Sequence, residues 1–402
     1  MSDTTITRVP APSRELSNVA AIVGVGETDY HLDYKASRAK APGYELPTPE
    51  KLVKTAFERA LADSGLKRSD IDGLSVSLIY GGPDAASMAQ LLDIKPRYLK
   101  QNGGLFAGPL QTVCADMAAG ECDTVVMVYA AASRAIGRQY GGTTYQDGGA
   151  PTSYYYYNPW GWSSQAAHWA LMFRYYQATY GISEADLGAV AVKLRQHAMN
   201  NSNAVMQAPL SIDDYMSSRY IVRPLHLFDI CLVNDGAVCF IVRRADKARD
   251  LTHKPVLVSG WGESFVKRNK MHSMVRERLR PQLQAAGEQA LQMADRQLSD
   301  IQHFEGYDTS TFHLLCQLEG YGFSEQGAGL ELFNGSGNNK LHINTAGGML
   351  SEAYMHGWNH VAEITRQLRH EAGVRQVPGV ETSMFSLAQT DQAHPIIFTR
   401  GA

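Results

Sequence analysis

The sequence lacks the features that mark a membrane-spanning, exported or nucleic-acid-binding protein. No apolar run approaches the roughly 20 residues of a membrane-spanning helix, and residues 1–17 hold no apolar segment typical of a signal peptide. The formal net charge is only −3 over 402 residues, which provides no basic surface for nucleic acid. We therefore expect a cytoplasmic protein with no membrane span and no nucleic-acid partner, in which residues 1–18 form a flexible arm.

Motifs for metals and nucleotides are also missing. The five cysteines follow neither a CxxC pattern nor a Cys/His ligand spacing, which argues against disulfides and a structural metal. No Walker loop is present, and GVGETD lacks the glycine spacing of a dinucleotide fingerprint. We expect no metal and no cofactor, and we interpret the cysteines as buried small hydrophobic residues: Cys114, Cys122, Cys231, Cys239 and Cys316.

What the sequence does contain is an alternation of strands and helices. A buried strand is expected at 19–26, a helix at 48–64 ended by Gly65, and further elements follow up to residue 133. This order of strand, helix, strand, helix and strand is typical of a mostly parallel sheet with crossover helices. The 402 residues suffice for two domains or one duplicated unit, so the fold class is α/β.

An internal repeat favours the duplicated unit. Three segments of the second part restate segments of the first: 255–265 restates 20–30, 290–308 restates 60–78, and 344–353 restates 100–109. The chain therefore divides into an N-terminal half, 19–250, and a C-terminal half, 254–402. Each half carries a Gly-Gly turn that enters a helix, and two such helix starts facing each other would enclose one site.

An insertion at about 134–224 follows neither half. It is rich in Tyr, Trp and Gly, which indicates either a lid or oligomer contact, or a satellite core beneath a long loop. After it, Asn234-Asp235-Gly236 predicts a tight turn between two strands. The basic run at 266–272 is interpreted as a contact for a ligand phosphate or as a solvated loop.

The stretch 342–371 is the strongest candidate for a site of chemistry. A short strand leads through Gly347-Gly348 into a helix, an arrangement in which backbone N–H groups can receive an oxyanion or a phosphate. The alternative is an ordinary strand-to-helix crossover. Five side chains of this elbow can transfer protons: Ser351, Glu352, Tyr354, His356 and His360.

Several motifs together resemble the thiolase superfamily. They are the duplicated halves, LFDICLVNDGAVCFIV, GYDTSTFHLLCQLEGYGF and NTAGGMLSEAYMHGWNHVAEITRQLR. The branch that the chain resembles most is that of the lipid-transfer-protein or sterol-carrier-protein-type thiolases, which includes aldolases of steroid side-chain degradation. The resemblance implies a duplicated five-layer αβαβα fold with an inserted loop domain, a homodimer and an acyl-CoA substrate.

The chain departs from the thiolase pattern at the positions that carry the chemistry. The resemblance places the nucleophilic cysteine of thiolases among Gly103, Gly104 and Leu105, where this chain has no Cys, Ser or Thr. Cys114 lies about 15 Å further along the expected helix and cannot replace it. Tyr354 and Tyr307 stand at or beside positions where the family has histidines, although each tyrosine alone is also compatible with a packing role.

These departures favour an aldolase, a carbon–carbon lyase that cleaves a β-hydroxyacyl-CoA without a covalent nucleophile. We expect Tyr354 and Tyr307 as acid and base, and His356 as the group that lowers a phenol pKa. The predicted supporting residues are Asp308 as an orienter, Gly347, Gly348, Gly103 and Gly104 as oxyanion donors, and Asn344 in substrate contact or backbone support.

Two other functions remain open at this stage. One is a β-ketoacyl-CoA thiolase with a nucleophile elsewhere in the chain, and the other is a non-catalytic acyl-CoA-binding subunit of a complex. By resemblance, the aldolases work with a small DUF35-type partner, which combines an OB fold with a zinc ribbon. The resemblance therefore implies a heterotetramer with this partner.

Overall fold

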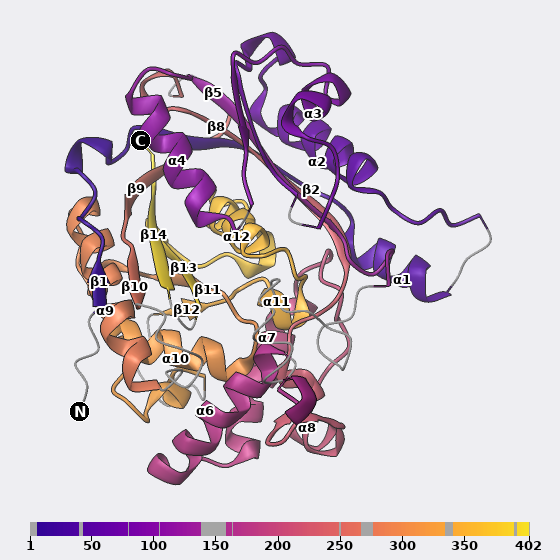
Figure 1. Ribbon diagram of the computed structural model, residues 1–402, viewed down its shortest axis with the longest axis vertical. Helices are drawn as coiled ribbons and strands as arrows, with labels where there is room; N and C mark the ends of the chain where they lie inside the picture. The colour runs from indigo at the N-terminus through magenta and orange to yellow at the C-terminus, as the bar shows by residue number, and fades with distance from the viewer. Residues whose placement is uncertain are drawn as a thin grey trace.

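The fold is described from a computed structural model of the chain (Figure 1). The described residues are 6–39, 43–78, 80–103, 105–137, 158–162, 164–248, 251–266, 276–333, 341–389 and 392–401. Gly104, the aromatic-rich stretch 138–157 and most of the basic run at 266–272 therefore lie outside the described part of the chain.

Two sets of five strands form the framework, and they have the same order. The N-terminal set runs β2-β8-β5-β3-β4, from β2 (Ala20–Glu27) through β8 (Asp235–Arg244), β5 (Thr124–Ala132) and β3 (Gly73–Ser77) to β4 (Tyr98–Gln101). The C-terminal set runs β9-β14-β13-β11-β12, from β9 (Val256–Trp261) through β14 (Gln392–Arg400), β13 (Thr382–Ala388) and β11 (His303–Gly306) to β12 (His342–Ile343).

The pairing senses also correspond between the two sets. In both, the first three strands are antiparallel neighbours and the outer pairs are parallel. The sets meet where β2 pairs antiparallel with β9, through Ala21 opposite Leu257 and Ile22 opposite Val256. The repeat in the sequence thus corresponds to a repeat in topology.

Helices cover the strands in layers. Between the two sets lie α4 (Ala107–Ala118) and α12 (Trp358–Arg369), whose apolar side chains share one core with strands of both halves (Figure 1). The outer face of the N-terminal set carries α2 (Pro49–Ser64) and α3 (Ala85–Leu91). The outer face of the C-terminal set carries α9 (Arg276–Ala294) and α10 (Thr311–Tyr321). This five-layer αβαβα arrangement confirms the predicted fold class.

Matching glycines explain why the repeated strand segments resemble each other. A Cβ atom on Gly26 would lie 2.1 Å from the carbonyl oxygen of Ala56 in α2. In the second half, a Cβ atom on Gly262 would lie 2.0 Å from the carbonyl oxygen of Ala286 in α9. Each glycine therefore allows a helix to pack directly on its strand, and GVGETD serves packing rather than nucleotide binding.

The expected helix at 48–64 forms as α2, for local reasons. Thr48 accepts a hydrogen bond from the N–H of Lys51, and Pro49 occupies the first turn, where its missing N–H costs nothing. Gly65 ends the helix in the left-handed conformation, at φ +68°. One face of the helix, which includes Val53, Phe57 and Ala60, is buried and packs α2 against the sheet.

The flexible arm expected at residues 1–18 is wrong for the described part of that range. Residues Ile6–Arg8 form β1, which pairs with β10 (Ser264–Val266). Arg14 forms an ion pair with Asp295 at 2.6 Å, and the Ser17 hydroxyl donates to the carbonyl of Ser259. Backbone pairing and single polar contacts hold this segment in place. Such contacts leave no hydrophobic pattern in the sequence, so the strand could not be predicted.

The hairpin predicted around Asn234-Asp235-Gly236 is also wrong. Only β8 forms there, and it begins at Asp235, with no strand assigned at 230–234. Its neighbours are β2 and β5, which precede it by more than a hundred residues, so the apolar run pairs at long range. The amide of Asn234 instead accepts a hydrogen bond from the N–H of Tyr354 at 2.7 Å.

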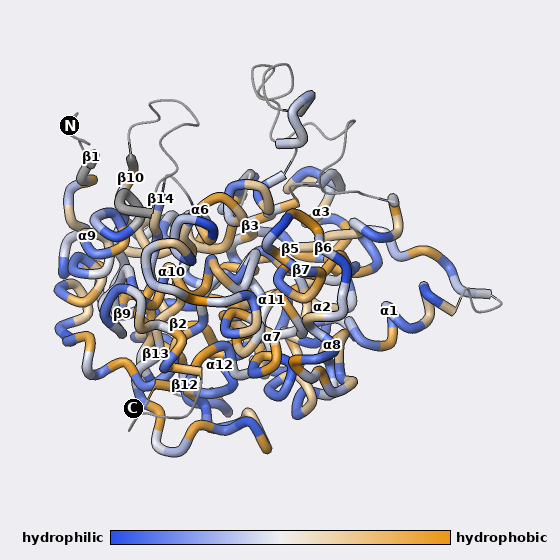
Figure 2. The backbone as a smooth tube through the Cα atoms, turned by 90° about the horizontal axis from the view of Figure 1, so that it is seen from below, coloured by the Kyte–Doolittle hydropathy of each residue, from blue (hydrophilic) through white to orange (hydrophobic). Residues whose placement is uncertain are grey.

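The described part of the insertion is mostly helical, with one short strand, β6 (Tyr220–Val222). It contains α6 (Gln165–Tyr180), α7 (Glu184–Met199) and α8 (Ile212–Ser217). Apolar side chains of α6 and α7 pack in the same core as α9 and α10, so these helices extend the C-terminal half. Figure 2 shows hydrophobic stretches of the strands toward the interior and hydrophilic stretches on α1 (Tyr30–Ala39) and α8 toward the outside. No helix in the described ranges combines the length and apolar character needed to cross a membrane.

Candidate active site

The Gly-Gly elbow folds differently from the simple turn that was expected. Gly347, at φ +105°, begins a four-residue helix, α11 (Gly348–Ser351), rather than the long helix α12. A second left-handed turn follows at His356 (φ +50°) and Gly357 (φ +89°), and α12 begins only after it. Tyr354 and His356 therefore lie in a loop between two helices.

Asp308 holds the start of α11. Its Oδ1 accepts from the N–H of Met349 at 2.8 Å, and its Oδ2 accepts from the N–H of Leu350 at 3.3 Å. A Cβ atom on Gly348 would lie 2.2 Å from this carboxylate, so the position requires glycine. Asp308 thus fixes the first turn of α11, and its role as an orienter of the reacting groups stays a prediction. The N–H of Gly347 donates to the carbonyl of Asn344, and a role for Gly347 and Gly348 as oxyanion donors stays a prediction.

Both polar ends of the Asn344 side chain contact the backbone of Gly306. Its Nδ2 donates to the Gly306 carbonyl at 3.0 Å, and its Oδ1 accepts from the Gly306 N–H at 2.7 Å. The side chain is fully buried between the ends of β11 and β12. This arrangement favours backbone support over substrate contact.

A buried ionic chain lies behind the elbow. Glu305 Oε2 lies 2.6 Å from Nδ1 of His360, whose Nε2 lies 3.0 Å from Asp308 Oδ1; Glu305 Oε1 lies 3.0 Å from Nε2 of His303. Burial alone would lower the pKa of His360, but the hydrogen bonds and charges of Asp308 and Glu305 outweigh it and raise that pKa to about 10. His360 is therefore a buried cation that holds two carboxylates in place.

The same balance acts on the carboxylates. Burial would raise the pKa of Glu305, yet the hydrogen bonds from His303 and His360 lower it to about 2. For Asp308 burial prevails over the His360 hydrogen bond, and its pKa is raised. Glu305 is thus firmly ionised, whereas Asp308 is the weaker acid of the pair.

Four tyrosines and one histidine meet on the other side of the elbow. The hydroxyl of Tyr354 lies 3.5 Å from that of Tyr307 and 3.0 Å from Nε2 of His356. The hydroxyl of Tyr80 lies 2.9 Å from the same Nε2, and the hydroxyl of Tyr129 makes a short hydrogen bond to Nδ1. We name these five residues the phenol cluster. Its members come from both halves, since Tyr80 follows β3, Tyr129 lies in β5 and Tyr307 follows β11.

Backbone contacts fix Tyr307 and Tyr354, the two tyrosines expected at or beside family histidine positions. The N–H of Tyr354 donates to Asn234, and the N–H of Tyr307 donates to the carbonyl of Ser386 at 2.9 Å. The carbonyl of Tyr307 accepts a hydrogen bond from the amide nitrogen Nε2 of Gln317 at 2.9 Å. Tyr307 is 3% and Tyr354 9% exposed, so their phenols face each other in a nearly dry site.

Tyr80 and Tyr129 were missed in the sequence. Tyr129 lies in an apolar strand, where a tyrosine is usually interpreted as a residue of the hydrophobic core. Tyr80 precedes two glycines in a turn and is not distinguished by its sequence neighbours. The available signal is their position toward the carboxyl ends of neighbouring parallel strands, where side chains converge in α/β proteins. That convergence requires the strand order, which the sequence does not give.

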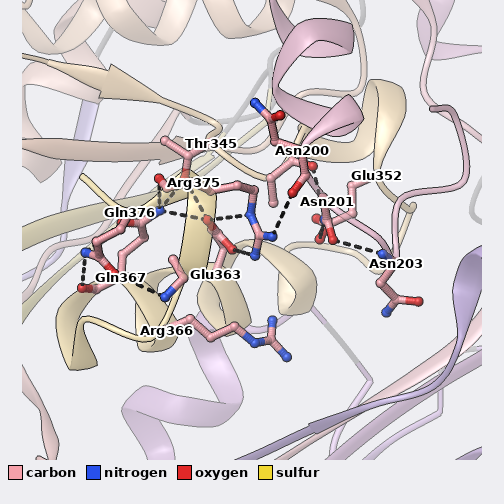
Figure 3. Close-up of polar contacts among 12 residues, drawn as sticks. Asn200, Asn201, Asn203, Thr345, Glu352, Glu363, Arg366, Gln367, Arg375 and Gln376 are labelled. Atoms are coloured by element: carbon pink, nitrogen blue, oxygen red, sulfur yellow. Dashed lines mark hydrogen bonds and ion pairs between the residues drawn. The ribbon is translucent and has the colours of Figure 1, made fainter. Parts of the chain in front are cut away.

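The remaining proton-transfer candidates of the elbow lie in separate polar networks. Both carboxylate oxygens of Glu352 accept hydrogen bonds at 2.8 Å, one from Asn201 and one from Asn359. Figure 3 shows Glu352 beside Asn201. Burial, followed by the charge of Glu27, raises the pKa of Glu352 well above its usual range. The Ser351 hydroxyl accepts from Arg195 at 3.1 Å. Neither residue contacts the phenol cluster through these bonds.

Cysteine chemistry has little support at the site. Cys114 is 1% exposed inside α4, and burial raises its thiol pKa far above the usual value. Burial, followed by the charge of Asp308, raises the thiol pKa of Cys231 to about 12. A raised pKa suppresses the thiolate, which is the nucleophilic form. At Gly103, in the turn before α4, an added Cβ atom would meet no other atom within 4 Å.

Known proteins share this architecture. A family model described as "Thiolase C-terminal domain-like" matches residues 264–390. Human mitochondrial 3-ketoacyl-CoA thiolase in complex with CoA aligns with a TM-score of 0.67 over 96% of this chain and 99% of that chain, at 14% identity. The two corresponding halves and this alignment thus define a protein of the thiolase fold.

Two curated relatives are more similar in sequence. A 17-hydroxy-3-oxo-4-pregnene-20-carboxyl-CoA lyase of Mycobacterium tuberculosis is 34% identical over 91% of this chain and 95% of its own. A steroid side-chain-cleaving aldolase of Thermomonospora curvata is 32% identical over 93% of this chain and 96% of its own. A structure described as "Ltp2-ChsH2(DUF35) aldolase" aligns with a TM-score of 0.81 at 28% identity, over 96% of this chain and 98% of that chain. The chain belongs to the family of thiolase-fold aldolases that contains these relatives.

Proposed function

We propose that this protein is an aldolase that cleaves a β-hydroxyacyl-CoA with a bulky, steroid-like acyl part, giving a ketone or aldehyde and a short acyl-CoA. We place it in the cytoplasm, with no cofactor beyond the CoA of its substrate. One observation carries the proposal: the hydroxyls of Tyr307 and Tyr354 lie 3.5 Å apart, and that of Tyr354 lies 3.0 Å from Nε2 of His356. We propose that these phenols act where thiolases use histidines. The names of the relatives supply the substrate class.

The reaction needs a base, an acid and a site for an oxyanion. One phenolate takes the proton of the β-hydroxyl group, the Cα–Cβ bond breaks, and its electron pair enters the thioester as an enolate. The hydroxyl carbon becomes the carbonyl of the ketone or aldehyde. The other phenol then protonates the enolate carbon, and a proton passes between Tyr354 and Tyr307 to restore the starting state.

The difficulty for this chemistry is the phenol pKa, which is about 10 in water. A phenolate needs a nearby group that accepts its proton or stabilises its charge. His356 is placed for this task, because its Nε2 lies 3.0 Å from the Tyr354 hydroxyl. In a water-poor site such a pair interacts more strongly than it would in solution.

The proposal extends to the binding of the substrate and to assembly. Gly347, Gly348, Gly103 and Gly104 are proposed to line the thioester, with Asp308 orienting the first pair through α11. We further propose a homodimer that binds a small DUF35-type protein to form a heterotetramer. The structure described as "Ltp2-ChsH2(DUF35) aldolase" supports this partner.

The direct test is to incubate the purified protein with 17-hydroxy-3-oxo-4-pregnene-20-carboxyl-CoA. The reaction is run with and without a DUF35-type protein from the same genome. We expect formation of a ketone and a short acyl-CoA, detected by mass spectrometry. Absence of both products under both conditions, for this substrate and for shorter β-hydroxyacyl-CoA thioesters, overturns the proposal.

A further inference from the structure

Tyr129 is a fully buried phenol whose position is fixed from several sides. Its strand neighbours are Ser77 in β3 and Val238 in β8, so hydrogen-bonded strands hold its backbone on both edges. Its ring stacks on Trp358 at the start of α12, with ring centroids 5.6 Å apart and an interplanar angle of 20°. The hydroxyl is therefore held toward Nδ1 of His356, with which it makes a short hydrogen bond.

His356 adopts an unfavourable backbone conformation to reach this place. Its φ of +50° lies in the left-handed region, which is uncommon for residues other than glycine and is strained for a residue with a side chain. The turn brings its ring back beside Tyr354, two residues earlier, with ring centroids 4.5 Å apart. The cost is offset by the surrounding contacts, as is common at functional sites.

The two nitrogens of His356 have different partners. Nδ1 faces Tyr129, whereas Nε2 faces Tyr354 and the partly exposed Tyr80. Three phenols of the described residues thus contact the imidazole directly, and the hydroxyl of Tyr307 lies 3.5 Å from that of Tyr354. A neutral imidazole carries one N–H and one lone pair, so the partner of one nitrogen decides what the other nitrogen can do.

We propose that Tyr129 is a positioning residue of the site: its hydroxyl oxygen accepts a hydrogen bond from Nδ1–H of His356, which leaves the Nε2 lone pair facing Tyr354. In this tautomer the proton of the Tyr354 phenol passes to Nε2, giving a phenolate beside an imidazolium, and it returns when the reaction ends. Tyr354 is then the base of the cleavage and Tyr307 the acid. The inference rests on the proposed function, because the phenolate is useful only for that reaction.

The first test needs no turnover. ¹⁵N NMR of the unliganded protein with labelled histidine reports which nitrogen carries the proton, and the signal of His356 is identified by its loss in His356→Asn. Asparagine suits the left-handed backbone at this position. We expect the proton on Nδ1 in the wild type and a loss of that preference in Tyr129→Phe. A proton on Nε2 in the wild type, or an unchanged preference in Tyr129→Phe, overturns the inference.

The second test is the pH profile of kcat in the presence of the pregnene-carboxyl-CoA substrate. Tyr129→Phe keeps the ring on Trp358 but removes the hydroxyl, so we expect kcat to fall about tenfold and KM to stay within about twofold. Because Tyr354 loses a well-oriented acceptor, its pKa rises and the rising limb of the profile moves to higher pH by about one unit.

A matched control is Tyr215→Phe. Tyr215 is likewise fully buried, and its hydroxyl donates to Asp229 at 2.7 Å, far from the phenol cluster along the chain and in a different core. We expect this variant to lose stability without moving the pH profile. An unmoved profile in a folded Tyr129→Phe, or the same shift in Tyr215→Phe, overturns the positioning role. An inactive wild type contradicts the proposed function instead, while the NMR result still decides the tautomer.

Discussion

The Nε2 atom of His360 lies 3.0 Å from Oδ1 of Asp308, the residue that follows Tyr307 in the chain. The same carboxylate accepts hydrogen bonds from the first turn of α11, which leads to Tyr354. A single buried cation is thus connected to both tyrosines of the proposed acid–base pair. Stability and geometry of the site depend on the same contacts.

The stability of the protein should depend on pH through this chain. The folded pKa of His360 is raised to about 10, so its contribution is fully present below the unfolded value of about 6.5 and is lost as the pH rises through about 10. Glu305 behaves oppositely: its contribution is present above its unfolded value of about 4.3 and is lost as the pH falls toward about 2. Urea unfolding from pH 2 to 10 measures both limbs.

His360→Gln isolates the alkaline limb. Removing the cation leaves two buried carboxylates without their partner, which should lower the free energy of unfolding at neutral pH by roughly 3–5 kcal/mol. The remaining stability should fall less steeply above pH 7 than in the wild type. Equal slopes in the two proteins would show that His360 is not the group that titrates.

Tyr354→Phe and Tyr307→Phe should each lower kcat by about 10²–10⁴-fold, because each removes one partner of general acid–base catalysis. Binding of the CoA thioester should change little, since the rings remain in place. Steady-state kinetics and calorimetric binding measure the two effects separately. Unchanged turnover in both variants would remove this acid–base pair, and tight binding without turnover in the wild type would favour a non-catalytic subunit.

Alkylation distinguishes the aldolase from a thiolase. Burial raises the thiol pKa of Cys114, Cys122, Cys231 and Cys239, so none of these four has the depressed pKa of a nucleophilic cysteine. We expect full aldolase activity after treatment of the folded protein with iodoacetamide at neutral pH. Loss of activity in parallel with the modification of a single cysteine would support the thiolase alternative.

Gly348→Ala should damage the site through the backbone. A Cβ atom there would lie 2.2 Å from Asp308, and φ is +60°, so we expect a loss of about 1–3 kcal/mol in the free energy of unfolding. Gly108→Ala in α4 is the matched control, because its added Cβ meets no atom within 4 Å and a helix favours alanine. Thermal unfolding of the two variants gives the comparison, and equal stability would contradict the close contact with Asp308.

Local chemistry made much of the fold predictable. The apolar run that forms β2 and the Thr48, Pro49 and Gly65 signals of α2 lie within short windows of sequence. The repeat predicted two similar halves, and the halves share one strand order. The mistakes at Asn234 and at residues 6–18 arose where pairing partners lie far away in the chain. The order of strands in the sheet decides such pairing, and a short stretch of sequence carries no information about that order.

For the site, the sequence by itself determined which chemical groups are available. Positions 307 and 354 are tyrosines, position 103 is a glycine and not a cysteine, and His356 follows Tyr354 by two residues. Tertiary structure alone decided how these groups meet. Strands of both halves bring Tyr80 and Tyr129 onto the two nitrogens of His356, because side chains distant in sequence converge only once the sheet order is set.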